Sequence, residues 1–183
     1  GYESSNLKFS RYTGTLGKGG SRTGGLAGQI DGTITSSNSS GSVTANSSYV
    51  GGLMGYGVHI TSSYSSADVS ASNWYGGGLA RQATCTINTS YATGGVTGLI
   101  SGSTVDYAGH YVGGLSGYSN GYINDSYYTG PLVKGGHRTG GLVGHTDGRI
   151  YRSSSTGEVQ SNSSYVGGLV GYMGEYVIDS WAT

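Results

Sequence analysis

Large aliphatic residues recur along this chain at three repeated intervals. A Gly-Gly-Leu phrase comes first, a second aliphatic residue follows about eight positions after its Leu, a third about nine positions later, and the next phrase about ten later. The phrase leucines are Leu26, Leu53, Leu79, Leu115, Leu142 and Leu169. The second series is Ile34, Ile60, Ile87, Ile123, Ile150 and Val177, and the third is Leu16, Val43, Val69, Val96, Leu132 and Val159. Because a helix buries positions three or four residues apart, these intervals fit no helix face.

The intervals add up to a unit of about 27 residues that repeats along the chain. A period of this length indicates one supersecondary unit stacked on copies of itself. Turn-forming pairs such as Asp31-Gly32 and Asn120-Gly121 separate the apolar positions, which are flanked by β-branched and aromatic residues. The pattern predicts an all-β fold, a three-sided parallel β-solenoid with about 27 residues per coil and about six to seven coils. We expect residues 1–183 to form a single domain of this kind.

Composition supports this prediction and weakens its alternatives. Gly occupies 38 of the 183 positions, only 10% of the residues are charged, and Pro occurs once. Stretches rich in Ala, Leu, Glu, Lys and Arg are absent, which excludes a helical solenoid. A chain rich in Gly and Ser can also be disordered, but the regular aliphatic spacing and the 17 Tyr favour a folded one. The paired glycines before each Leu predict a corner where the backbone either takes a positive φ or approaches a neighbouring coil too closely for a Cβ.

Aromatic residues recur at three coil positions and predict stacked columns. One set precedes the glycine pair: Tyr49, Tyr75, Tyr111 and Tyr165. A second set follows Gly-Gly-Leu: Tyr56, Tyr118 and Tyr172. A third set lies four residues past the second aliphatic series: Tyr64, Tyr91, Tyr127 and Trp181. Rings repeated at one coil position are expected to stack about 5 Å apart, either as internal support or as an exposed platform for a sugar polymer.

A longer repeat and one irregular coil are superimposed on the 27-residue period. Residues 1–56 match residues 117–172 at an offset of 116, with 33 of 56 positions identical, so four coils form a block that is partly duplicated. The third full coil carries an insertion at about residues 97–110. Insertions in solenoids usually form loops on one face, often the binding face. The candidate binding residues of this insertion are Asp106, Tyr107, His110 and Tyr111.

The titratable residues form no pattern of a catalytic or metal site. The nine Asp and Glu are dispersed, whereas a polysaccharide hydrolase or lyase needs carboxylates that converge on one face. His145 and Asp147 form a His-x-Asp pair, but Gln29 stands at the equivalent of His145, so we interpret this histidine as lying outside the repeated design. Cys85 is the only cysteine, and no spacing resembles a zinc site. We therefore expect no enzyme activity, no metal and no cofactor.

Charge and hydropathy argue against two classes of partner and favour a third. The net charge is zero with dispersed Lys and Arg, which removes the electrostatic basis for nucleic-acid binding. No apolar run approaches the length that crosses a membrane, so we expect no membrane insertion. Neither terminal coil carries a recognisable cap, and a bare coil offers unpaired backbone groups like any sheet edge. We expect head-to-tail self-association through the terminal coils.

Two segments resemble a known family. GGLARQATCTINTSYATGGV from Gly77 and GGLSGYSNGYINDSYYTGPL from Gly113 are similar to the GLUG motif, which joins a Gly-Gly-Leu corner to a Ser-Tyr-Ala-Thr-Gly segment. That motif recurs in bacterial surface proteins, including large adhesins and the non-catalytic part of some secreted IgA-cleaving metallopeptidases. The resemblance implies an extracellular or cell-surface β-solenoid repeat region, bacterial or archaeal, without catalytic residues. Arg81 and Gln82 depart from the motif, because they replace the usual Gly-Tyr after Gly-Gly-Leu.

The sequence thus predicts a non-catalytic extracellular structural or adhesive repeat protein. Its specific form is a subunit of a surface fibre or filament assembled by end-to-end stacking of coils. A glycan-binding module of a secreted protein is the alternative, with the tyrosine columns or the insertion contacting surface glycans. Ice binding is a further alternative, but Thr33-x-Thr35 and Thr84-x-Thr86 do not recur in register from coil to coil.

Overall fold

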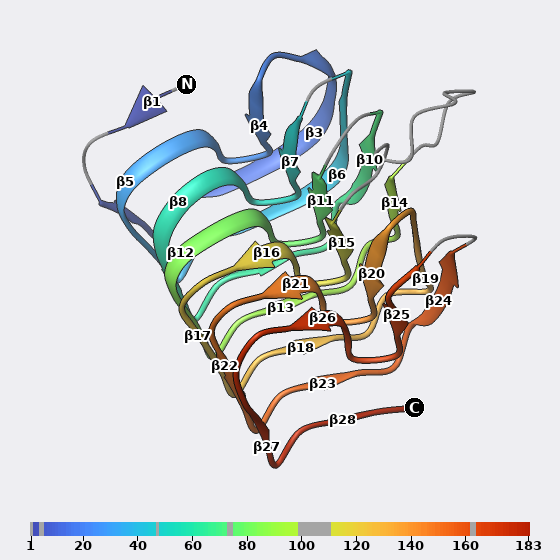
Figure 1. The fold of residues 1–183 in the computed structure, drawn as a ribbon. Helices are drawn as coiled ribbons and strands as arrows, with labels where there is room; N and C mark the ends of the chain where they lie inside the picture. The colour runs from blue at the N-terminus through green and yellow to red at the C-terminus, as the bar shows by residue number, and fades with distance from the viewer. Residues whose placement is uncertain (1, 4–5, 47, 73–74, 99–110, 162–163) are drawn as a thin grey trace.

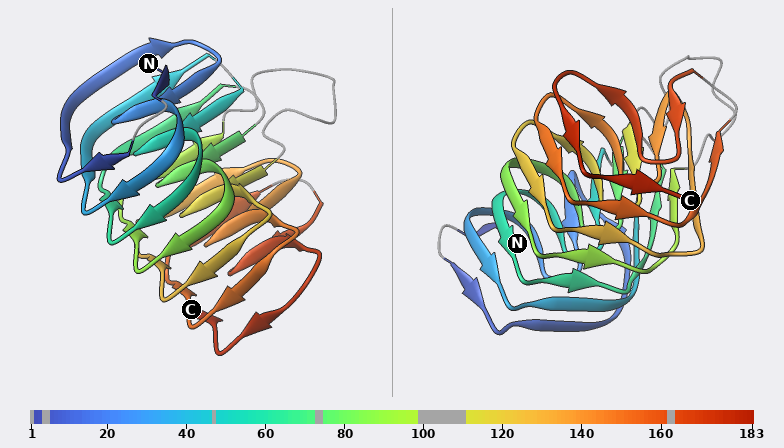
Figure 2. Two further views of the ribbon diagram at one scale, coloured as in Figure 1. Left: turned by 90° about the vertical axis from the view of Figure 1, so that its left-hand side faces the viewer. Right: turned by 90° about the horizontal axis from the view of Figure 1, so that it is seen from below.

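The structure is a stack of coils, and each coil contributes strands to three parallel sheets. The computed structural model describes residues 2–3, 6–46, 48–72, 75–98, 111–161 and 164–183. All described strand pairs are parallel, and none of the described residues is helical. The chain winds from its N-terminus at one end of the stack to its C-terminus at the other (Figures 1 and 2). These observations confirm the predicted β-solenoid, with about six turns roughly 27 residues apart.

The strands group by coil side. Sheet A contains β1 (Tyr2–Glu3), β2 (Leu7–Lys8), β5 (Ala27–Thr35), β8 (Met54–Thr61), β12 (Ala80–Asn88), β16 (Ser116–Ser119), β17 (Tyr122–Asn124), β21 (Val143–Thr146), β22 (Arg149–Tyr151), β26 (Val170–Met173) and β27 (Val177–Ile178). Sheet B contains β3 (Arg11–Gly19), β6 (Asn38–Ala45), β9 (Tyr64–Ser65), β10 (Asp68–Ala71), β13 (Tyr91–Ala92), β14 (Val96–Gly98), β18 (Tyr127–Tyr128), β19 (Leu132–Gly135), β23 (Ser154–Ser155), β24 (Glu158–Ser161) and β28 (Trp181–Ala182). Sheet C contains β4 (Arg22–Gly24), β7 (Tyr49–Gly51), β11 (Tyr75–Gly77), β15 (Tyr111–Gly113), β20 (Arg138–Gly140) and β25 (Val166–Gly167).

The three aliphatic series form the core. In sheet A, Ile34 pairs with Ile60 and Ile60 with Ile87, and Ile87 then pairs with Ile123 across the irregular coil. Each of these side chains is fully buried. A coil with one buried aliphatic residue per side has a thin core, so its stability depends on the ladders that join neighbouring coils as well as on apolar burial.

One member of the third aliphatic series is predicted wrongly. Val133 pairs with Val96 and is fully buried, whereas Leu132 pairs with Glu158 and is only half-buried. The cause is Tyr128, whose ring is fully buried at the position that Ala92 occupies in the preceding coil. The Tyr128 hydroxyl donates to the Leu132 carbonyl at 2.9 Å, so the backbone runs one residue further around the large ring before it turns inward.

The paired glycines mark a close approach of backbones. A Cβ on Gly78 would lie 2.1 Å from the Gly114 carbonyl oxygen, and a Cβ on Gly77 would lie 1.9 Å from the Ala80 carbonyl oxygen. Among the described glycines, only Gly14 and Gly41 have a positive φ. Of the two explanations that the sequence allowed, the close approach is therefore the one that applies at this corner.

A ladder of serines, buried except at its two ends, joins the coils where sheet A turns into sheet B, and we call it the serine ladder. The Ser90 hydroxyl accepts a hydrogen bond from the Ser63 backbone N–H at 3.1 Å and donates to the Asn88 carbonyl at 2.8 Å. The same two bonds recur in successive coils at Ser37, Ser63, Ser90, Ser126, Ser153 and Ser180. Ser10 begins the ladder, because its backbone N–H donates to the Ser37 hydroxyl at 3.1 Å. The residue before each of these seven serines has a positive φ: Phe9, Ser36, Ser62, Thr89, Asp125, Arg152 and Asp179. This sharp turn takes the serine N–H away from a neighbouring carbonyl, and the side chain of the next coil supplies the acceptor instead.

Candidate functional site

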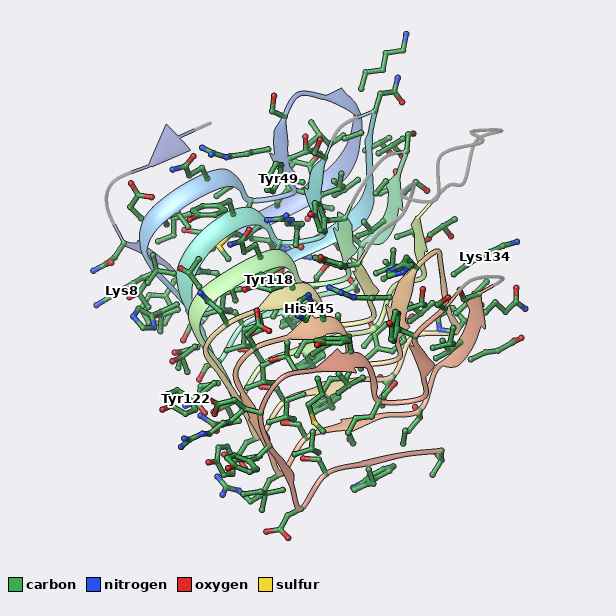
Figure 3. All side chains as sticks on the ribbon, in the orientation of Figure 1. Lys8, Tyr49, Tyr118, Tyr122, Lys134 and His145 are labelled. Atoms are coloured by element: carbon green, nitrogen blue, oxygen red, sulfur yellow. The ribbon has the colours of Figure 1, made fainter. Side chains whose placement is uncertain are left out.

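Two columns of polar and aromatic side chains flank the Gly-Gly-Leu corner, and we call them together the seam. The sheet C column is Arg22, Tyr49, Tyr75, Tyr111, Arg138 and Tyr165. The sheet A column is Gln29, Tyr56, Gln82, Tyr118, His145 and Tyr172. Figure 3 shows Tyr49, Tyr118 and His145 following one another down this corner of the molecule. The tyrosines predicted to form the first two columns all belong to the seam, which confirms their shared coil positions.

The two columns touch each other across the corner. The ring centroids of Tyr111 and Tyr118 are 6.2 Å apart, and those of Tyr165 and Tyr172 are 5.7 Å apart. At the N-terminal end, the Arg22 guanidinium lies 5.1 Å from the Tyr56 ring centroid. The corner therefore brings side chains before and after the glycine pair into one continuous cluster along the axis.

Arg81 fills the middle of the seam at a position where the neighbouring coils have Gly55 and Gly117. Its guanidinium lies 3.8 Å from the Tyr49 ring centroid and 3.9 Å from that of Tyr75, and the residue is 4% exposed. Burial lowers the pKa of Arg81 to about 10. A cation held between two aromatic faces away from water gains about 2 kcal/mol or more from this contact. The departure from the motif at Arg81 is thus a packing feature of the seam.

The arginine also explains an exception to regular ring stacking. Tyr64, Tyr91 and Tyr127 stack in parallel with centroids 4.9 Å apart, as the sequence predicts. The predicted fourth member, Trp181, does not continue this stack, because the register places Ser154 between Tyr127 and Trp181. The rings of Tyr49 and Tyr75 are instead 6.0 Å apart and tilted by 32°.

His145 is the centre of a hydrogen-bonded chain in the C-terminal half of the seam. The Arg138 Nη1 lies 2.8 Å from His145 Nδ1, and His145 Nε2 lies 3.0 Å from Asp147 Oδ1. The other carboxylate oxygen of Asp147 accepts from the Tyr118 hydroxyl at 2.9 Å. Arg138 also donates to the Tyr111 hydroxyl at 2.9 Å. Because a guanidinium can only donate, His145 Nδ1 must accept and its proton must sit on Nε2, which donates to Asp147.

The environment favours this neutral form of His145. Burial lowers the pKa of His145, and the Arg138 charge acts in the same direction, against the opposing influence of Asp147. Burial and the hydrogen bond to Asp147 raise the pKa of Tyr118 to about 12. Burial alone would raise the pKa of Asp147, but the hydrogen bonds from Tyr118 and His145 outweigh it and hold that pKa below its usual value. At neutral pH the chain of hydrogen bonds from Arg138 to Asp147 and Tyr118 therefore holds one cation, Arg138, and one anion, Asp147, while His145 and Tyr118 are neutral.

The N-terminal half of the seam contains the same chain with a different central residue. The Arg22 guanidinium donates to Gln29 Oε1, and Gln29 Nε2 donates to Asp31 Oδ1 at 3.2 Å. The interpretation of His145 as lying outside the repeated design needs correction, because Gln29 and His145 bridge an Arg to an Asp in the same way. The signal in the sequence was the pair of shared spacings, Arg-x6-Gln/His-x-Asp, at an offset of 116 residues.

The residues predicted to bind a ligand are only partly placed. Asp106, Tyr107 and His110 lie outside the described residues, as does most of the predicted insertion at 97–110. Tyr111 belongs to the seam, where it is half-buried and bonded to Arg138, and its ring meets His145 edge-on at 4.8 Å. The structure thus gives Tyr111 internal contacts, and binding by the insertion stays a prediction.

The threonines considered for ice binding do not form a lattice in sheet A. The register places His59 between Thr33 and Thr86, and Thr86 is followed by Tyr122. The side chain of Cys85 lies outside the part of the chain whose side chains are described.

Two further observations concern the described part of the chain. No group of three or more His, Cys, Asp or Glu there could hold a metal ion, and no helix there could cross a membrane. A surface hollow of about 130 Å³ lies beside Asp147, where Arg149 Nε pairs with Glu175 Oε2 at 2.7 Å.

The repeated coils, ladders and seam define a repeat-type structural protein built as a parallel β-solenoid. Residues 135–160 match the GLUG motif, which confirms the resemblance and is consistent with a GLUG-repeat region. The matched segment includes β20, β21 and β22, and therefore Arg138, His145 and Asp147. Comparison with curated proteins gives no match, and comparison with solved structures gives none either.

Proposed function

We propose that this chain is a non-catalytic structural or adhesive element outside the cell, forming part of a surface fibre by end-to-end stacking of coils. The observation that carries the proposal is that equivalent residues of successive coils pair in parallel in all three sheets, since a coil can then accept another coil of the same kind. The GLUG motif supports an extracellular setting, because the motif is found in extracellular proteins. The backbone hydrogen bonds between coils run along the stack, so the element would carry load along its axis through many parallel bonds.

Charge complementarity supports stacking in a head-to-tail sense. Residues 1–26 contain four cationic residues and one acidic residue: Lys8, Arg11, Lys18, Arg22 and Glu3. Residues 158–183 contain three acidic residues, Glu158, Glu175 and Asp179, and no Lys, Arg or His. These two coils lie at opposite ends of the described stack (Figure 2). A basic face and an acidic face steer association and suppress contacts between like ends.

The strand register determines which residues of two copies would meet in a head-to-tail contact. Leu7 heads the column that ends at Val177, and Ser10 heads the serine ladder that ends at Ser180. Arg11 heads the column that ends at Trp181, which is 53% exposed. A second copy added at the same spacing would place its Ser10 hydroxyl at the Ser180 N–H and its Arg11 over the Trp181 ring. The aliphatic contact and the serine hydrogen bond would continue series that already join successive described coils.

Sedimentation and electron microscopy of the 183-residue chain test the proposal. We expect elongated particles whose length grows with protein concentration and shrinks with salt, because exposed charges are screened above about 0.1 M. Strictly monomeric particles at high concentration and low salt would refute self-association.

Charge reversal gives the sharper experiment. The pair Lys8→Glu and Arg11→Glu should stop association, and so should the pair Glu158→Lys and Asp179→Lys, which leaves the ion pair of Glu175 with Arg149 intact. Mixing the two reversed proteins should restore alternating fibres, because each then presents the complement of the other. The exposed Lys134 lies on sheet B one coil in from the C-terminal end, where it pairs with Gln160 and would not meet the added copy, so Lys134→Glu is the matched control and should associate normally (Figure 3). Association that ignores all of these changes would contradict the head-to-tail arrangement.

A further inference from the structure

The two halves of the seam contain the same hydrogen-bonded chain, but only one of them can change its charge near neutral pH. Gln29 accepts from Arg22 and donates to Asp31 whatever the pH. His145 does the same between Arg138 and Asp147, but only while it is neutral. Histidine is the side chain whose ordinary pKa places this change between pH 5 and 8.

Protonation of His145 would break its bond to Arg138. Nδ1 would carry a proton and could no longer accept from the guanidinium nitrogen 2.8 Å away. Two cations would then face each other in a partly buried site, where their repulsion is weakly screened. The bond from His145 Nε2 to Asp147 would persist and strengthen, so the histidine would stay in place and Arg138 would be displaced.

The charged and aromatic side chains that contact His145 come from neighbouring strands and from the turn after β21. Arg138 lies on β20 and opposes protonation, while Asp147 follows β21 and favours it. The rings of Tyr111, Tyr118 and Tyr172 meet the imidazole edge-on at centroid distances of 4.8, 5.1 and 4.8 Å. His145 is 8% exposed, so water can replace the lost hydrogen bond only if the cluster opens.

Arg138 connects the histidine to the rest of this half of the seam. Its guanidinium lies 4.9 Å from the Tyr111 ring centroid, 4.3 Å from that of Tyr172 and 5.7 Å from that of Tyr165. Displacement of Arg138 would therefore remove contacts that hold β15, β20 and β26 together.

We propose that His145 makes the C-terminal half of the seam an acid-sensitive latch, closed while Arg138 bonds to the neutral imidazole and loosened when the imidazole is protonated, while Gln29 keeps the N-terminal half closed. The latch gives one end of the solenoid a different response to acid from the other. It acts inside one chain and does not require the fibre contacts proposed above.

Exchange of the two central residues tests the latch. Amide hydrogen exchange is followed by NMR between pH 7.5 and 5.0 and corrected for intrinsic exchange rates. Protection factors in β20 and β26 should be about tenfold lower at pH 5.0 than at pH 7.5, whereas those in β4 and β7 should change little. His145→Gln should abolish the acid effect, and Gln29→His should create one in β4 and β7. His137→Gln is the matched control, because His137 also contacts the Tyr165 ring but lies outside the hydrogen-bonded chain from Arg138 to Asp147.

Imidazole nitrogen shifts provide the second measurement. At pH 7.5 they should identify a neutral His145 with its proton on Nε2, which would lose this signature as β20 and β26 lose protection. Acid sensitivity that survives His145→Gln, or a proton on Nδ1 at pH 7.5, would overturn the proposal. Failure of fibre assembly would leave these measurements unaffected, so the two proposals can fail separately.

Discussion

The serine ladder gives a prediction whose size can be worked from the structure. Ser90 lies in the middle of the ladder and is fully buried. Ser90→Ala removes the acceptor of the Ser63 N–H, which is held at 3.1 Å, and leaves that donor buried without a partner. The Asn88 carbonyl loses the donor at 2.8 Å but keeps its bond from the Ser62 N–H at 3.1 Å.

The loss of unfolding free energy in Ser90→Ala follows from the Ser90 hydroxyl, the Ser63 N–H and the Asn88 carbonyl. The hydrogen bond itself contributes about 1 kcal/mol, and an orphaned buried N–H adds about 1–2 kcal/mol. Loss of one hydroxyl leaves almost no cavity, so the free energy of unfolding should fall by about 2–3 kcal/mol. For a chain of this size each kcal/mol lowers the melting temperature by about 2–4 °C, which gives a fall of about 4–12 °C.

Urea unfolding followed by circular dichroism measures the effect. Ser70→Ala is the matched control, because Ser70 lies on β10 between buried Val69 and Ala71 and points outward. We expect the midpoint of Ser90→Ala to fall well below those of the wild type and the control. Equal midpoints for the two variants would show that the ladder serines contribute no more than ordinary surface serines.

Four further predictions address other parts of the coil. Gly78→Ala should cost more than about 3 kcal/mol in urea unfolding, because its Cβ would meet the Gly114 backbone oxygen at 2.1 Å, whereas Gly20→Ala has nothing within 4 Å and should stay within about 0.5 kcal/mol. Thr89→Asn should stabilise by about 0.5–1 kcal/mol in the same assay, because a β-branched residue tolerates a φ of 47° poorly. Arg81→Ala should cost about 2–4 kcal/mol, because it empties the space between Tyr49 and Tyr75, and an unchanged midpoint would exclude that role. Burial holds the pKa of His145 below 6.5, so as the pH falls the unfolded chain takes up this proton before the folded chain does. The melting temperature should therefore keep the full contribution of neutral His145 above about pH 6.5 and fall below that pH, and His145→Gln should reduce this fall between about pH 6.5 and 5.

The sequence was sufficient to predict the architecture because the coil repeats. In the third aliphatic series only Leu132 was assigned wrongly, and the other five members were enough to predict the coil. That error arose because the size of Tyr128 acts through space on a backbone four residues away, and no spacing rule contains such an effect. The glycine corner was left with two explanations because both demand the same residue.

The site was harder to predict, for a different physical reason. The seam joins residues on the two sides of a corner, and the sequence does not state how sharply that corner folds. The sequence aligns Gln29 with His145, but the two look unrelated by residue type, and their common role became visible only through the nitrogen and oxygen atoms that bridge Arg to Asp. The serine ladder went unnoticed because serine is abundant throughout the chain, so its recurrence every coil carried little weight.

That ladder has a consequence for how such a chain can lengthen or shorten over generations. Each serine corner bonds to a chemically identical corner, so removal of residues 38–63 would join Ser37 to Tyr64 and bring Ser90 to the position that Ser63 held. The stack would lose about 4.8 Å of length, one strand spacing, and no class of bond. Length is therefore a quantity that recombination can adjust coil by coil, and the match of residues 1–56 to residues 117–172 is the sequence pattern that such an adjustment would leave.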